Sequence, residues 1–484
     1  MFFKRLFLTP IITAIFLLCS PTLSFSSVQI ATDTEFNAQN LPKLDSLKKD
    51  KPLNLNIPKM QRFTTTNGVP VIFTAVHELP IVDISILFDG GSSKDSELKK
   101  DGFGIANMTA NLMTKGTKNL NEDAFSWQAE RLGVTLGANV NQDSFAYIFR
   151  SLAGDDELLP ALSLFTNMIA NPLFDKDTVK RAKETTLIGL KLSEQSADYL
   201  ATTTFLNAIY GTHPYAKDTI GTQSSVANIS ADDLKHYHQK YLVAQNAYIS
   251  ITGDLSEQKA RQIAEQLSMV LPNGNKATLT PAPKKPKPTH IHVDYDSPQT
   301  VIIIGHLGAK DAKTAKEIEQ ELNFRLGNKV LAGGDFNARL MTAIRKQGGY
   351  TYGITGSMIT YAQNGIYRIR FSTTTDKAKE AIEKTLKIVK DTLETGISEN
   401  ELRLATTSLR HAYPMTLSNN LAIHNMATYL NKENLPDSYV SGFLSRLDNV
   451  TVASVNHALK SQIRPDEFII VTVGKQKPDL SDLF

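Results

Sequence analysis

The sequence predicts an α+β protein of two similar halves, each an antiparallel-rich sheet with helices packed on it, which face each other like the shells of a clam. Three observations lead to this prediction. Alternating stretches typical of strands are interleaved with amphipathic helical stretches over residues 60–254 and again over residues 290–412. A segment rich in proline and lysine separates the two series. The second series repeats the order of the first, which indicates an internal duplication.

Length and charge limit the possible functions. The chain of 484 residues is long enough for two to four domains. Its formal net charge is +3, and charged residues make up 21% of it, which is ordinary for a globular protein. Because the lysines and arginines are scattered along the chain, we expect no nucleic-acid partner.

The beginning of the chain is typical of a secretory signal peptide. Two basic residues precede an apolar run over residues 6–18, and small residues follow at 24–26. An uncleaved membrane anchor is the alternative, although the run is short for a bilayer span. The single cysteine, Cys19, lies inside this segment, so the exported chain would hold no disulfide. We expect residues 1–26 to be the signal peptide, residues 27–58 to be a polar leader, the location to be the periplasm, and no membrane span to remain after signal removal.

The rest of the chain divides into three segments. We expect an N-terminal domain over residues 59–270, a linker over residues 271–289 and a C-terminal domain over residues 290–484. The centre of the linker, residues 281–288, reads PAPKKPKP and favours a semi-extended backbone. Its lysines could bind an acidic surface, but a solvated spacer is the simpler interpretation.

Local patterns predict the elements of the N-terminal half in order. A hairpin over residues 63–73 turns at Asn67 and Gly68. Further strand patterns lie at residues 81–88 and 134–151, and helical patterns lie at residues 104–117, 121–131, 155–169 and 176–195.

The C-terminal half repeats this succession. Strand patterns lie at residues 290–295, 300–304, 350–358 and 365–373, and helical patterns lie at residues 312–331, 376–395 and 399–412. The stretch Ala-Tyr-Ile-Phe-Arg at residues 146–150 and the helix after it correspond to Ile-Tyr-Arg-Ile-Arg at residues 366–370 and the helix after that.

The helix expected at residues 104–117 carries polar side chains at an unusual spacing. Asn107 and Asn111 lie four residues apart, and therefore on one face, with Ala110 beside them. Gly116 and the threonine after it would end the helix. The apolar residues that recur at helical spacing are Ile105, Met108 and Leu112.

This stretch resembles the zinc-site helix of the inverted-zincin metallopeptidases, the family of pitrilysin, insulinase and mitochondrial processing peptidase, whose sequence there is close to G-x-A-H-x-x-E-H-M-x-x-K-G-T. Two more stretches resemble the family: residues 211–216, which match its H-P-Y-G loop, and residues 237–254, which match the segment closing its first domain. The resemblance covers about residues 60–475. His213 in the loop could be a ligand, but a histidine before a proline in a turn is more often a hydrogen-bonding cap.

The resemblance implies a zinc site from which every expected residue is missing. Asn107 and Asn111 stand where the family has its two histidines, and Ala110 stands where it has the general base. The third ligand, a glutamate, would fall at or near Gly189, while the nearby Glu184 is out of register. A neutral amide is a poor zinc ligand, and a methyl group cannot accept a proton. We therefore expect this chain to bind no cofactor and to have no metallopeptidase activity on its own.

Residues 336–352 resemble the family's S-R-L-x-x-x-[IL]-R-x-x-x-G-x-x-Y motif. The pattern predicts an apolar helical stripe of Phe336, Leu340 and Ile344, and a strand from Tyr350 with Tyr352 on the same face. By the resemblance, Arg345 would bind the substrate backbone and Tyr352 would donate its hydroxyl to the scissile carbonyl. Alternatively, Arg345 favours the end of a helix whatever its function, and Tyr352 could belong to the core with its hydroxyl at the rim.

The leading hypothesis is a non-catalytic, exported subunit that binds peptide and completes the site of a separate, zinc-bearing subunit. A structural scaffold of the same fold, with no role in proteolysis, is the second hypothesis. A hydrolase acting by another route is the third, but no G-x-S-x-G, H-E-x-x-H or phosphate-loop motif is present. The pairs His236/His238 and His290/His292 could begin an independent metal site, although no third ligand stands close in sequence.

Overall fold

The computed structural model describes residues 57–483. The expected signal peptide at residues 1–26, and the expected leader as far as residue 56, lie outside the described residues. Within the described range, no helix combines the length and the apolar character that crossing a bilayer requires.

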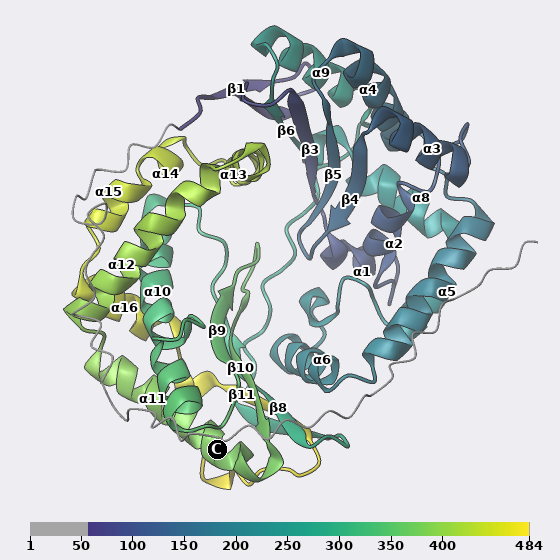
Figure 1. Cartoon of the computed structure of the whole chain (residues 1–484). Coiled ribbons are helices and arrows are strands. Elements are labelled where there is room, and N and C mark those ends of the chain that lie inside the picture. The colour runs from purple at the N-terminus through teal and green to yellow at the C-terminus, as the bar shows by residue number, and fades with distance from the viewer. Residues whose placement is uncertain (1–56, 484) are drawn as a thin grey trace, which may run out of the picture. The chain divides into compact units, whose positions relative to one another are not determined.

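Two mixed sheets form the framework (Figure 1). In the described residues, the N-terminal sheet has six strands in the order β1-β2-β6-β3-β5-β4, and the C-terminal sheet has five in the order β7-β11-β8-β10-β9. The strands of the first sheet are β1 (Met60–Thr64), β2 (Pro70–Ala75), β3 (Ile81–Asp89), β4 (Thr135–Val140), β5 (Ser144–Leu152) and β6 (Ala247–Gly253). The strands of the second are β7 (Thr289–Asp294), β8 (Gln299–Leu307), β9 (Ile354–Ile359), β10 (Ile366–Thr374) and β11 (Ile469–Gly474).

The two sheets share one topology. β2 runs parallel to β6, as β7 does to β11, and the other neighbouring strands are antiparallel. The order β2-β6-β3-β5-β4 therefore matches β7-β11-β8-β10-β9 strand for strand, with β1 added at one edge. The predicted α+β class and the two similar halves are confirmed.

Helices pack on the sheets of both halves. Those of the N-terminal half are α1 (Asp95–Leu98), α2 (Ile105–Leu112), α3 (Glu122–Leu132), α4 (Asp155–Ala170), α5 (Lys176–Ser193), α7 (Gln223–Ala227), α8 (Ala231–Tyr241) and α9 (Glu257–Val270). Those of the C-terminal half are α10 (Ala315–Ala332), α11 (Ala378–Thr395), α12 (Glu399–Ala412), α14 (Ser438–Ser441), α15 (Phe443–Asp448) and α16 (Val452–Gln462). Several begin at a side-chain cap, and Thr314 and Ser398 form capping boxes with Glu317 and Glu401.

Two helices are exchanged between the halves (Figure 1). The first, α6 (Ala197–Tyr210), belongs to the N-terminal half but packs on β8 and β11, where Phe205 is fully buried. The second, α13 (Asn420–Lys432), belongs to the C-terminal half but packs on β2, β3 and β6. Asn431 of α13 donates a hydrogen bond from Nδ2 to the carbonyl oxygen of Ile249, at 2.8 Å. Each half therefore completes the core of the other.

The strand predicted from Tyr350 begins instead at Ile354. The cause is local: the Thr351 hydroxyl donates to the carbonyl oxygen of Gly353 at 3.0 Å and lies 3.2 Å from its backbone nitrogen, which closes a turn. Gly349 before it has a φ of +59°, which also interrupts an extended backbone. Tyr350 and Tyr352 therefore lie outside the strand.

The predicted apolar stripe is wrong at its first member. Leu340 and Ile344 are fully buried, but Phe336 is 60% exposed. Phe336 precedes the helical segment, which is a π-helix over Met341–Gln347. Its ring contacts the side chains of Arg345 and Lys346 in the last turn of that helix.

Candidate functional site

A buried carboxylate fixes the beginning of α2. Asp95 is fully buried and accepts hydrogen bonds from the backbone nitrogens of Gly104, at 2.8 Å, and Ala106, at 2.9 Å. These donors satisfy two of the free N–H groups in the first turn of the helix. Burial raises the pKa of the Asp95 carboxyl to about 8, whereas the backbone donors oppose this rise. The side chain of Asp95 therefore fixes the backbone at the beginning of α2.

The two asparagines of α2 bind each other. Asn111 donates from Nδ2 to Oδ1 of Asn107 at 3.0 Å, which confirms that the two side chains share a face. Asn107 is half-buried and Asn111 is exposed, while Ala110 is 4% exposed and packs in the core. The pair therefore uses one amide oxygen and one N–H group on itself.

The position of the expected third ligand lies on α5, which packs against α2. Gly189 is exposed there, and no heavy atom lies within 4 Å of the place where a Cβ would be. Glu184 is five residues earlier, about 140° around the helix at 3.6 residues per turn, so it faces elsewhere. The helices that carry these positions pack together, but an amide pair, a methyl group and a glycine do not fit a zinc ion.

Three of the four histidines in the two pairs have structural partners, and the fourth, His236, is exposed. His238 is buried, its Nε2 lies 2.8 Å from the carbonyl oxygen of Ile169, and burial lowers its pKa. His290 Nε2 and His292 Nδ1 lie 2.9 and 2.8 Å from the same hydroxyl, that of Thr472. Across residues 57–483, no group of three or more histidine, cysteine or acidic side chains is arranged to hold a metal ion.

His213 caps a turn, as predicted. Its Nδ1 accepts from the backbone nitrogen of Tyr215 at 3.2 Å, so its Nε2 is the protonated nitrogen that reaches the carbonyl oxygen of Pro281 at 2.8 Å. The Tyr215 hydroxyl in turn donates to Asp143, which also accepts from the backbone nitrogen of Ala362 at 2.8 Å. This loop joins the N-terminal hairpin, the segment between the halves and the C-terminal hairpin.

Arg345 is held in place by an aromatic ring. It lies in the last turn of the π-helix, half-buried, with its guanidinium carbon 4.8 Å from the centre of the exposed ring of Phe336. Within the described part of the chain, it has no hydrogen-bond or ion-pair partner. Arg339, at the start of the same motif, forms two hydrogen bonds to the carboxylate of Glu401, at 2.8 and 2.7 Å. Arg339 is therefore used for folding, while Arg345 keeps its donors free.

The two tyrosines of the motif differ in the same way. Tyr350 donates its hydroxyl to Glu380, which anchors it to α11. Tyr352 is 87% exposed, and its hydroxyl has no partner among residues 57–483. The alternative that Tyr352 belongs to the core is therefore wrong. Sequence periodicity could not separate the two, because it placed both on one strand.

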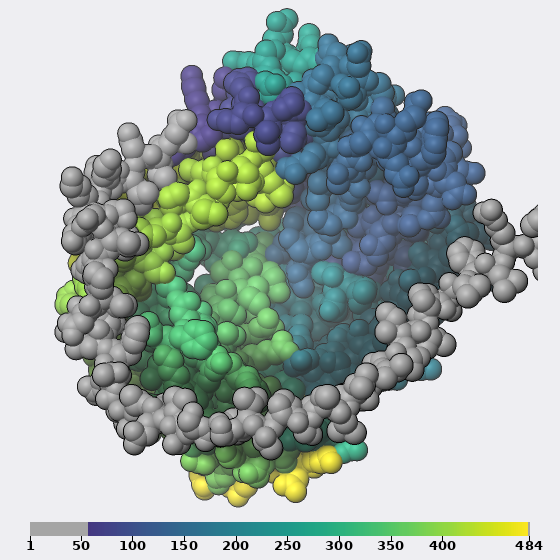
Figure 2. All heavy atoms as spheres, viewed as in Figure 1, coloured from purple at the N-terminus to yellow at the C-terminus, as the bar shows by residue number. Residues whose placement is uncertain are grey.

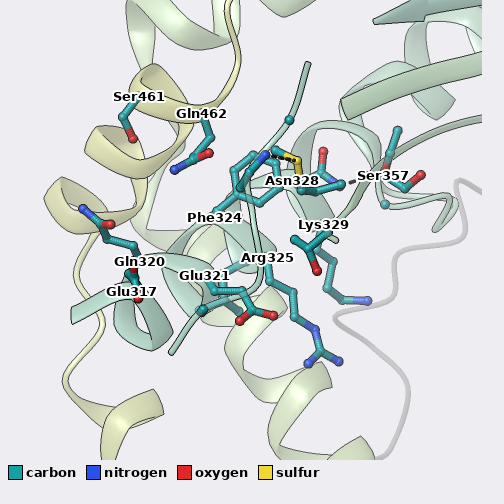
Figure 3. Close-up of a pocket in the computed structure, with 18 of the residues that line it drawn as sticks. Glu317, Gln320, Glu321, Phe324, Arg325, Asn328, Lys329, Ser357, Ser461 and Gln462 are labelled. Carbon is teal, nitrogen blue, oxygen red and sulfur yellow. Dashed lines mark hydrogen bonds between the residues drawn. The ribbon is translucent and has the colours of Figure 1, made fainter. Parts of the chain in front are cut away.

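A cavity of about 940 Å³ lies in the C-terminal half, between α10, β9 and the ends of α12 and α16. Figure 3 shows Glu321 and Arg325 of α10 in the wall of this cavity, together with Ser357 of β9 and Gln462 of α16. Figure 2 shows a separate feature, a hollow bordered by α13, and α13 contributes no residue to the lining of the cavity. Glu321 is exposed to the water in the cavity, but the protein atoms around it partly desolvate its carboxyl group. This desolvation raises the pKa of Glu321.

None of the six positions that the sequence singled out lines this cavity. By strand and helix order, α10 and β9 are the counterparts of α2 and β4. The cavity therefore occupies, in the C-terminal half, the place that the degenerate metal position occupies in the N-terminal half. Sequence patterns could not indicate this cavity, since charged residues at helical spacing on α10 are also typical of a solvated face.

Comparisons with known proteins match most of the chain. The family model described as insulinase (peptidase family M16) matches residues 71–223, and the model described as peptidase M16 inactive domain matches residues 228–409. The non-peptidase homolog YmxG of Helicobacter pylori is 25% identical over 420 residues, which cover 85% of this chain and 93% of that protein. The mitochondrial-processing peptidase subunit beta of Saccharomyces cerevisiae is 19% identical over 381 residues, or 77% of this chain and 81% of that one. Among solved structures, a peptidase M16 inactive domain from Pseudomonas fluorescens superposes with a TM-score of 0.81 and 29% identity, covering 87% of this chain and 98% of that chain.

Proposed function

Since the chain belongs to the insulinase family of peptidases, family M16, in a non-catalytic form, we propose that it is an exported subunit that pairs with a zinc-bearing peptidase chain and supplies substrate-binding residues to their joint site. The substrate is a peptide, held partly by this chain and cleaved by the metal chemistry of the partner. This chain itself binds no zinc.

One observation carries the proposal. The positions that bind zinc in the family carry no zinc-binding side chains here, whereas the two expected substrate-binding side chains are present and unpaired among the described residues. Arg345 and Tyr352 have no partners among the described residues, although Arg339 and Tyr350 in the same motif are both anchored. In a scaffold, an unpaired arginine and an unpaired tyrosine beside anchored neighbours would serve no purpose. In a subunit that binds peptide, the same side chains are available to donate hydrogen bonds to a peptide carbonyl group.

Pairing with a second chain is supported by the comparisons at a coarser level. The yeast relative is described as a subunit of a processing peptidase, and the Helicobacter relative is described as a non-peptidase homolog. We infer that the present chain meets a family member with intact zinc ligands, in the periplasm if the segment at residues 1–26 acts as a signal peptide.

The test is reconstitution with a zinc-bearing chain of the same family from the same organism. Mixing the two purified chains with internally quenched peptides should give zinc-dependent cleavage that neither chain shows alone. Tyr352→Phe should lower kcat/KM about 10²–10³-fold, the range seen when one transition-state donor is removed. Arg345→Ala should also lower it. Both variants should nearly keep the melting temperature of the wild type, because neither side chain has a hydrogen-bond or ion-pair partner among the described residues and the contact of Arg345 with the exposed ring of Phe336 is weak.

Matched controls are available in the same motif. Lys346→Ala removes an equal charge one residue after Arg345, and Tyr350→Phe removes a hydroxyl that binds Glu380 rather than substrate. Both controls should change kcat/KM by no more than a few-fold. Full activity in both Arg345→Ala and Tyr352→Phe would remove their assigned roles, and a mixture without any cleavage would favour the scaffold hypothesis instead.

A further inference from the structure

The exchanged helix α6 covers only part of the C-terminal sheet. Its apolar side chains pack on β8 and β11 and reach Ile366 at the start of β10 and Ile359 at the end of β9. Side chains alternate between the faces of a strand, so Arg368 and Arg370 of β10 lie on the same face as Ile366. Tyr367, Ile369 and Phe371 lie on the opposite face, in the core beneath the helices of this half. Beyond α6, the open part of the sheet therefore carries two arginines.

The two arginines differ in their partners. Arg370 forms an ion pair with Asp198 at the beginning of α6. Arg368 is half-buried, and within residues 57–483 it has no ion-pair or hydrogen-bond partner. The titratable groups that act on it are Arg370, which repels its charge, and Tyr361. Burial lowers the pKa of its guanidinium, which nevertheless remains charged at neutral pH.

The strand register explains why Arg368 has no acidic neighbour. Its cross-strand partners are Gly305 on β8 and Ser357 on β9. Both are small and uncharged. The ring of Phe205 from α6 packs over Gly305, but Ser357 is exposed, so the guanidinium has room on the side of β9. Ser357 also borders the cavity of the C-terminal half, although Arg368 itself does not line it.

The N-terminal half shows the alternative arrangement. Arg150 on β5, the counterpart of β10, forms two hydrogen bonds to the carboxylate of Asp83 on the next strand, at 2.7 and 3.0 Å. In the correspondence of the two strands given above, Arg150 matches Arg370, and both of these arginines are paired. The fold can therefore neutralise an arginine on this face of the sheet, whereas Arg368 has no partner among the described residues. A half-buried cation without a partner costs free energy, and it is retained where a ligand supplies the missing anion.

We propose that Arg368 binds a carboxylate of the peptide held by this chain, either an acidic side chain or the C-terminus. A guanidinium presents two parallel N–H donors that match the two oxygens of a carboxylate. This inference rests on the proposed peptide-binding function and adds a substrate class to it: peptides that bring a negative charge to the open part of the C-terminal sheet. Arg368 is a specificity-determining residue in this account, with no part in the bond cleavage.

The test measures binding to the purified full chain, without the partner subunit. Three fluorescent peptides of equal length are compared by anisotropy: one with aspartates and an amidated C-terminus, one with asparagines and a free C-terminus, and one with asparagines and an amidated C-terminus. Wild type should bind one or both charged peptides at least about tenfold more tightly than the neutral peptide, a difference of about 1.4 kcal/mol. Which charged peptide gains the affinity identifies the source of the carboxylate.

Arg368→Gln should remove this tenfold preference and leave binding of the neutral peptide unchanged, while Arg368→Lys should keep part of it. Lys390→Gln is the matched control, because it removes one exposed positive charge from the same half without touching the sheet. Equal weakening of all three peptides by Arg368→Gln, or equal affinity of wild type for all three, would overturn the inference and leave peptide binding intact. Failure of wild type to bind any of the three would instead reject the proposed function, and this inference with it.

Discussion

Asn107 and Asn111 retain the four-residue spacing of a metal-binding pair but satisfy each other. Ala110 between them is packed into the core, and the glycine at the third ligand position leaves open space. The backbone around these residues is still supported, since Asp95 caps the helix from a buried position. This position therefore differs from the zinc motif of the family at four side chains, on a backbone that is still supported.

Restoring those side chains should restore metal binding. The restoring substitutions are Asn107→His, Ala110→Glu, Asn111→His and Gly189→Glu. The fourfold variant should bind one zinc per chain by elemental analysis, because helical spacing places the new ligands on facing surfaces of α2 and α5. At a free zinc concentration of about 100 Kd, the metal should stabilise the variant by about 2.7 kcal/mol. Wild type is the control, and a fourfold variant that stays metal-free would show that the frame has moved as well.

At the scale of elements, α13 is fastened to the N-terminal sheet through a buried histidine. His424 Nε2 lies 2.7 Å from the hydroxyl of Ser85, and its Nδ1 lies 3.2 Å from that of Thr252. The charged groups that act on it are Asp83 and Arg150, which form an ion pair with each other. Burial lowers the pKa of His424 to about 4, below the ordinary value of about 6.5. The contact therefore requires a neutral imidazole.

This contact predicts a dependence of stability on pH. Below about pH 6.5 the unfolded chain takes up a proton that the folded chain excludes, so the stabilisation is present above that pH and is lost as pH falls towards 4. The full shift corresponds to about 3 kcal/mol. The free energy of unfolding should differ between wild type and His424→Gln at pH 7.5, and the difference should shrink steadily down to pH 5. Other histidines titrate equally in both proteins and cancel. A difference that does not change with pH would contradict the prediction.

Local signals in the sequence were sufficient for most elements but not for their long-range contacts. The hairpin at Asn67 and Gly68 and the position of α5 follow from turn chemistry and helical periodicity, which depend on neighbours in the chain. The beginning of β9 was less predictable, since the turn closed by Thr351 replaced the expected first residues of the strand. Nothing local indicated that α6 and α13 would pack on the opposite sheets. For the candidate site, the motif identified Arg345 and Tyr352, but it could not reveal which arginine or tyrosine already had a partner.

At the scale of the whole molecule, the exchanged helices make the two halves dependent on each other. Phe205 of α6 is fully buried against the C-terminal sheet, so close to Gly305 that a Cβ at that glycine would lie 2.8 Å from its ring. Residues 272–288, which join the halves, contain neither helix nor strand. The association of the halves therefore depends mainly on the packing of the exchanged helices, and the connecting segment adds hydrogen bonds to it, such as that from Gln363 Nε2 to the carbonyl oxygen of Thr280 at 2.8 Å.

Cutting the connection should not separate the halves. A chain with a specific protease site inserted between Lys284 and Lys287 should, after cleavage, elute from a sizing column as one species and unfold in one transition. Phe205→Ala should destabilise the cut and uncut chains by about 3–5 kcal/mol, the range for truncating a buried phenylalanine. The uncut chain with the same insertion is the control. Elution of two separate fragments from the cut wild type would show that the exchange does not hold the molecule together.

The exchange of α6 and α13 also bears on how a duplicated chain of this kind could begin. A lone half would leave one apolar sheet face uncovered, and two identical halves could protect both faces only by lending each other a helix, as in a domain-swapped dimer. Fusion through a short segment replaces that encounter in dilute solution with one at roughly millimolar local concentration. Assembly of the two halves then no longer depends on the concentration of the protein. Each half can also change in sequence while it stays covalently joined to the other half.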